Sequence, residues 1–133
     1  MASPANFFDT AHFLARCLRY RLHTEKLELK TLMQLDLAGA TALDIGANKG
    51  IYCFWMLRAV GRAGRVVAFE PQPEMAEAIR QKQARFGWTN LEIINVALSD
   101  AEGKLNLARD RVGRKRSERR FRAVVRRNSL LMC

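Results

Sequence analysis

The sequence predicts an α/β fold, a partial doubly wound (Rossmann-like) parallel sheet in the order β-α-β-α-β, preceded by two helices. Short apolar segments alternate with longer segments of helical periodicity, and this order implies parallel strands joined by right-handed crossovers. The strand segments are apolar nearly throughout, as expected of strands covered on both faces. A glycine-containing turn over residues 46–50 separates the first strand from the helix that follows it.

Each element is predicted from its periodicity and from the residues that end it. Apolar residues at helical spacing predict a helix over residues 6–21, followed by a second helix with Thr24 as its N-cap and Gly39 as its end. Pro73 suits the first turn of a later helix, and Gly87 lies near the end of that helix. The other predicted elements are strands over residues 40–45, 65–70, 91–98 and 104–108, and an all-round apolar helix over residues 51–60.

The positive charge is concentrated at the end of the chain. The net charge of the 133 residues is +10, but residues 1–108 hold 13 basic and 11 acidic side chains, whereas residues 109–133 hold 10 and 2. We therefore divide the chain into N-terminal helices (1–38), an α/β core (39–108) and an Arg-rich tail (109–133) that we expect to be disordered. The tail could instead be an arm that binds nucleic acid or an anionic surface, or the product of a shifted reading frame.

The cysteines and the hydropathy of the sequence indicate in which cellular compartment the protein lies. Cys17, Cys53 and Cys133 are odd in number and widely spaced, which argues against a disulfide framework or a zinc site and favours the cytoplasm. The apolar run over residues 51–57 is too short to span a bilayer, and residues 1–20 lack the pattern of a secretory signal. We expect no metal and no transmembrane segment, and the sequence leaves the oligomeric state open.

Polar residues gather where the first two predicted strands end. Asp44 precedes the 46–50 turn, and Glu70 ends the second strand. Ligands of such folds bind at the carboxyl ends of the strands, and a carboxylate such as Glu70 can accept hydrogen bonds from both ribose hydroxyls. A dinucleotide site would have the pattern G-x-G-x-x-G, but Asn48 occupies the middle of this turn, and Asp44 would repel a pyrophosphate. S-Adenosylmethionine suits the turn better, because it has a carboxylate, cationic groups and a ribose but no phosphate.

Three motifs, in order, resemble the FkbM-type class I S-adenosylmethionine-dependent methyltransferases. They are L-D-I-G-A-N-K-G over residues 43–50, V-A-F-E-P-Q-P over 67–73 and N-V-A-L-S-D over 95–100. The resemblance covers roughly residues 35–107. It implies a methyltransferase that uses S-adenosylmethionine and transfers a methyl group to a hydroxyl of a small molecule or glycan. Nucleic acid could be a partner only through the Arg-rich residues 109–133.

The same resemblance implies the roles of the site residues. The residues expected at the methionine end of the cofactor are Asp44, Gly46, Ala47, Asn48 and Gly50, with Glu70 at the ribose, Pro71 at the adenine side, and Ala97 and Asp100 near adenine. Simpler structural roles stay open for three residues. Asp44 could cap the turn, Asn48 could merely tolerate a left-handed conformation, and Asp100 could be a turn residue.

The family pattern stops after Leu107. Members of the family continue into a fourth strand with a K-x-D-x-E-G-like segment, and the residues that bind the acceptor usually lie in that half. We therefore expect a truncated or frame-shifted methyltransferase, possibly inactive, with no assigned catalytic base and with an unpaired edge on the first strand. The alternatives are an Arg-tailed binding module and a non-functional fragment.

Overall fold

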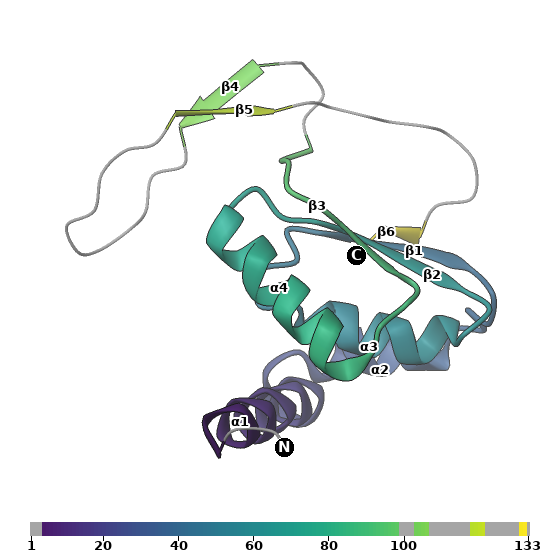
Figure 1. The fold of residues 1–133 in the computed structure, drawn as a ribbon. Coiled ribbons are helices and arrows are strands. Elements are labelled where there is room, and N and C mark those ends of the chain that lie inside the picture. Colours follow the sequence, from purple (N-terminus) through teal and green to yellow (C-terminus); the bar gives the residue numbers. More distant parts are fainter. Residues whose placement is uncertain (1–3, 99–102, 107–117, 122–130, 133) are drawn as a thin grey trace.

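The computed structural model describes residues 4–98, 103–106, 118–121 and 131–132, and Figure 1 shows their arrangement. The first half of the described chain is α1 (Pro4–Arg19), the π-helix η1 (Tyr20–Thr24), α2 (Lys26–Gln34), β1 (Thr41–Ile45) and α3 (Ile51–Val60). The second half is β2 (Arg65–Phe69), α4 (Pro73–Phe86), β3 (Leu91–Ile94), β4 (Gly103–Asn106), β5 (Glu118–Phe121) and β6 (Leu131–Met132). The predicted α/β class and the β-α-β-α-β order are confirmed.

The main sheet is parallel and has the order β3-β2-β1-β6. β1 pairs with β2 in the register Thr41↔Arg65, and β2 pairs with β3 in the register Val66↔Leu91. The carboxyl ends of β1 and β2 therefore lie side by side, which places Asp44 and the 46–50 turn next to Glu70.

The helices α2, α3 and α4 lie on the same face of this sheet (Figure 1). Side chains alternate between the faces of a strand, and on β2 both Val66 and Val67 are buried, as an apolar strand predicts. On β1, in contrast, Ala42 is buried but Ile45 is 37% exposed. The expectation of full cover on both faces therefore holds for β2 and fails at the end of β1.

Two sequence predictions need correction. Glu25, not Thr24, is the N-cap of α2, and its side chain makes no capping hydrogen bond, because the π-helix η1 carries the chain through Thr24. The predicted unpaired edge on β1 is also wrong, since Ala42 pairs with Leu131 of β6. β5 and β6 thus fall in the range 109–133 for which disorder was predicted, and the remaining residues of that range lie outside the described part.

The core joins the N-terminal helices to the helical face of the sheet. Phe13 and Cys17 of α1 are buried against α3, where Cys53 is fully buried and the Trp55 indole N–H donates to the Cys17 carbonyl at 3.2 Å. Trp88 stacks on Phe86 at 5.1 Å between ring centroids, next to the end of α4. The helices of the described residues include none that is long and apolar enough to cross a membrane.

Candidate functional site

The turn after β1 depends on left-handed backbone conformations. Gly46 and Gly50 have φ angles of 77° and 78°, and Asn48 has a φ of 48°. These angles are natural for glycine and tolerated by asparagine, which confirms the conformational reading of Asn48. The N–H groups of Gly46 and Ala47 both donate to the Phe69 carbonyl, at 2.8 and 3.0 Å. The end of β2 therefore holds the turn in place, and the N–H groups of Gly46 and Ala47 already have partners.

Asp44 lies beneath this turn and is 4% exposed. Its Oδ2 accepts a hydrogen bond from the Cys53 thiol at 3.0 Å, and the Cys53 backbone N–H also donates to this carboxylate. Burial raises the pKa of Asp44 above its ordinary value, and the nearby Glu70 adds to the rise, while the bonds from Cys53 oppose it. Burial also raises the pKa of the Cys53 thiol well above its ordinary value, so that the thiol keeps its proton. Asp44 thus caps the first turn of α3, whereas the structural role that the sequence left open was a cap on the 46–50 turn.

Glu70 connects the first turn to the second. It is 2% exposed, and its Oε2 accepts the Asn48 N–H at 2.7 Å while its Oε1 accepts the Gln72 N–H at 2.8 Å. The Asn95 side-chain amide donates to the Glu70 carbonyl at 2.7 Å, which brings the third motif to the same place. One buried carboxylate therefore fixes the turn after β1 and the start of α4, a role that its residue type alone did not reveal.

A cavity of about 320 Å³ opens beside the turn. Four of the predicted site residues line it, namely Asp44, Gly46, Ala47 and Asn48. The lining also includes six residues that were not among the predicted site residues, namely Arg16, Tyr20, Glu25, Lys49, Ile51 and Tyr52. The structure does not bring all the predicted residues into this lining. Gly50, Glu70, Pro71 and Ala97 stand outside it, and Asp100 lies outside the described residues.

Half of these further residues come from the N-terminal helices. The π-helix η1 begins at Tyr20, and Glu25 follows its last residue, so this local widening of the helix places both beside the cavity. The Tyr52 hydroxyl, on the first turn of α3, donates to the Glu25 carboxylate. The periodicity of residues 6–21 gave no signal for this arrangement, because π-helical turns have no sequence pattern that we could use. Within the described residues, no group of three or more His, Cys, Asp or Glu side chains could hold a metal ion.

Comparison with known proteins decides the family. The methyltransferase FkbM domain family matches residues 44–128, more than half of the chain. This chain belongs to the FkbM methyltransferase domain family. The match confirms the resemblance and, with it, S-adenosylmethionine as the cofactor. The match also extends past Leu107, where the resemblance was expected to end, into the Arg-rich range.

Individual relatives of this FkbM-family chain match only part of it. Protein-L-isoaspartate O-methyltransferase of Caenorhabditis elegans is 31% identical over 86 residues, which are 65% of this chain and 38% of the relative. A second similar protein is one assigned as an rRNA methylase from Clostridium thermocellum, whose solved structure has 18% identity and a TM-score of 0.50. The match covers 53% of this chain and 38% of the Clostridium chain, and it supports the fold alone. The structure of an S-adenosylmethionine-dependent methyltransferase from Aquifex aeolicus is 30% identical, with a TM-score of 0.48. The match covers 57% of this chain and 39% of the Aquifex chain. The chain thus spans about two fifths of the length of these proteins.

Proposed function

We propose that this chain binds S-adenosylmethionine in the cavity beside the 46–50 turn and takes part in methyl transfer to a hydroxyl oxygen. The observation that carries the proposal is the open space over Gly46. A Cβ built on Gly46 would meet nothing within 4 Å, and the same glycine lines the cavity above the buried Asp44. A ligand can therefore lie directly against the backbone at this point, as the tight approach of a cofactor requires.

The residues present fit this cofactor. When bound, S-adenosylmethionine supplies an electrophilic methyl group on a sulfonium sulfur. The cavity volume of about 320 Å³ lies at the lower end of the range of small-molecule sites. Asp44 and Glu25 provide negative charge on the lining for a ligand with a net positive charge, and Arg16 and Lys49 can face its carboxylate.

Glu70 retains capacity for a ribose although both its oxygens already have partners. Each carboxylate oxygen can accept two hydrogen bonds, and each accepts one backbone N–H here. We assign the remaining acceptor sites to the ribose hydroxyls. Pro71, which follows Glu70 in the second motif, and Ala97 of the third motif are both half-buried, and we assign them to the adenine side.

The hydroxyl acceptor remains part of the proposal. It is supported by the three-motif resemblance. The Caenorhabditis elegans relative is an O-methyltransferase by name, which supports an oxygen atom as the acceptor but does not favour a hydroxyl over a carboxylate. Transfer to a hydroxyl breaks the bond between sulfur and the methyl carbon, forms an oxygen–carbon bond, and releases the hydroxyl proton to a base. The cytoplasm stays a prediction from the cysteine spacing.

Calorimetric titration with S-adenosylhomocysteine tests the binding step. We expect saturable binding to the wild-type chain and at least about tenfold weaker binding to Asp44→Ala, because the variant removes a buried charge and a helix cap from the cavity. Asp36→Ala is the matched control, since Asp36 is exposed and outside the cavity lining. No heat and no thermal shift at millimolar ligand would refute the proposal.

A further inference from the structure

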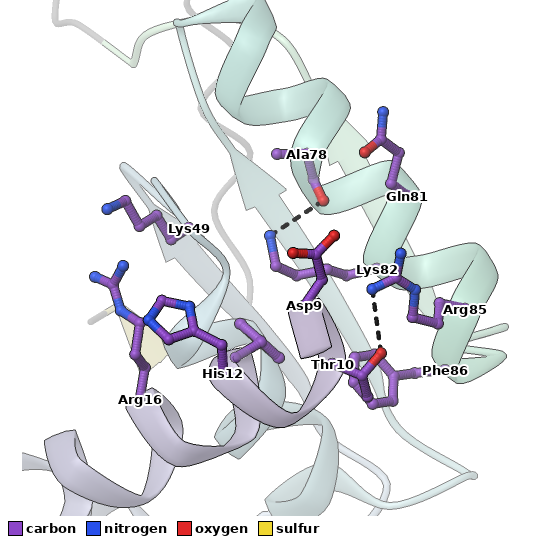
Figure 2. Close-up of a pocket in the computed structure, with 11 residues that line it drawn as sticks. Asp9, Thr10, His12, Arg16, Lys49, Ala78, Gln81, Lys82, Arg85 and Phe86 are labelled. Atoms are coloured by element: carbon purple, nitrogen blue, oxygen red, sulfur yellow. Dashed lines mark hydrogen bonds between the residues drawn. The ribbon is translucent and has the colours of Figure 1, made fainter. Parts of the chain in front are cut away.

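A second cavity adjoins the cofactor cavity. It has a volume of about 210 Å³ and lies between α1 and α4, as Figure 2 shows. Arg16 of α1 and Lys49 of the turn line both cavities, so these two side chains form a common wall. A molecule held in the second cavity would therefore lie next to the bound methyl donor.

The lining of the second cavity is strongly basic. Arg16, Lys49, Lys82 and Arg85 stand against one carboxylate, Asp9, and His12 adds a further polar group. The four basic residues come from α1, the 46–50 turn and α4, and the fold alone brings them together.

The surroundings of Lys82 show that the positive charges in this lining repel one another. Its Nζ donates to the Ala78 carbonyl at 3.3 Å and lies 5.1 Å from the centroid of the Phe13 ring. Burial lowers the pKa of Lys82 below its ordinary value, and the positive charge of Arg85 lowers it further. Arg16 and Lys49 act in the same direction. An anion bound among these side chains would relieve their repulsion.

We propose that this cavity binds the phosphate group of a phosphate-monoester acceptor beside the methyl donor, an inference that rests on the proposed function. Four cations and one carboxylate leave three positive charges, which suit a dianion better than a monocarboxylate. Arginine side chains offer paired donors to phosphate oxygens, and lysines add point charges. The small volume suits a compact group and not a whole nucleotide.

The test is a calorimetric titration of inorganic phosphate into the chain saturated with S-adenosylhomocysteine, at constant ionic strength. We expect phosphate to bind at least about tenfold more tightly than acetate, because the lining charge matches a dianion. Lys82→Met removes the charge while keeping an aliphatic side chain over Phe13, and we expect it to weaken phosphate binding at least about tenfold. Arg85→Gln, a change at an exposed position, is the second variant if Lys82→Met fails to fold.

Arg62→Gln is the matched control, because Arg62 is exposed and lines neither of these cavities. Equal weakening in Arg62→Gln and Lys82→Met would show only diffuse attraction to a basic chain and would overturn the inference. Absence of phosphate binding in a chain that binds S-adenosylhomocysteine would also overturn it while leaving the proposed function intact. Failure of S-adenosylhomocysteine to bind would instead remove the proposed function, and with it the role of this cavity as an acceptor site.

Discussion

Replacing Glu70 with glutamine tests whether this carboxylate holds the two turns together. The amide that replaces the carboxylate has one acceptor oxygen, so it can satisfy the N–H of Asn48 or of Gln72 but not both. The other N–H would face the amide NH₂ group, a second donor. Because Glu70 is 2% exposed, water cannot easily replace the lost acceptor.

The expected loss of stability follows from these two bonds. A hydrogen bond to a charged group contributes about 1.5–3 kcal/mol, and the surviving bond to a neutral amide contributes roughly 1 kcal/mol less than before. We therefore expect Glu70→Gln to lower the free energy of unfolding by about 3 kcal/mol. With a urea m-value of about 1.5 kcal/mol/M, the midpoint of unfolding would fall by about 2 M.

Urea unfolding followed by circular dichroism measures this change. Glu77→Gln is the matched control, since Glu77 lies on α4 with its side chain 57% exposed and pairs only with Arg80 among the described residues. An exposed ion pair contributes less than about 1 kcal/mol, so the control midpoint should hardly move. If Glu70→Gln unfolds at the same urea concentration as the control, the two backbone bonds do not carry the stability assigned to them here.

Three further predictions concern single residues. Asp44→Asn should weaken S-adenosylhomocysteine binding yet preserve or raise stability at neutral pH. Because burial raises the folded pKa of Asp44, the wild type loses stability as pH rises from the ordinary value through the raised one, and Asp44→Asn should lack that loss in thermal melts at several pH values. Gly46→Ala places a methyl group in the cavity at a φ of 77° and should cost about 1–2 kcal/mol as well as most of the ligand affinity measured by calorimetry. Gly64→Ala would set its Cβ 2.5 Å from the Val60 Cβ and 2.7 Å from the Ala40 carbonyl oxygen and should cost about 3 kcal/mol in urea unfolding; an unchanged midpoint would contradict the packing described.

The core elements could be predicted from local sequence because strong end signals mark them. α3 runs from Ile51 to Val60 as predicted, between Gly50 and Gly61, and α4 begins at Pro73 and ends before Gly87. The apolar pattern also predicted which residues are buried on the helical face of the sheet. This was possible because the periodicity and composition of a segment are properties of a few neighbouring residues. The first-turn motif likewise supplied four residues that line the cavity proposed for the cofactor.

The remaining features depend on contacts between distant segments. Leu131 pairs with Ala42 across most of the chain, and no local pattern in residues 109–133 predicts such a short strand. Arg16 enters both cavities through the packing of α1, which its helical spacing could not reveal. Glu70 was expected to bind the ribose. The structure shows a role that the sequence did not indicate, because the Glu70 carboxylate accepts a hydrogen bond from the Asn48 N–H and so holds the turn.

The shared wall between the two cavities gives a last prediction, on how their ligands affect each other. S-Adenosylmethionine carries a net positive charge, whereas S-adenosylhomocysteine is neutral overall. A phosphate in the second cavity would offset the charges of Arg16 and Lys49, which also line the cofactor cavity. Phosphate should then tighten binding of S-adenosylmethionine by about fivefold or more and leave S-adenosylhomocysteine nearly unchanged, as measured by calorimetry at fixed ionic strength. Since coupling is reciprocal, S-adenosylmethionine must tighten phosphate by the same factor. Equal effects on the two ligands would mean that the coupling is not electrostatic, and no effect on either would place the phosphate away from Arg16 and Lys49.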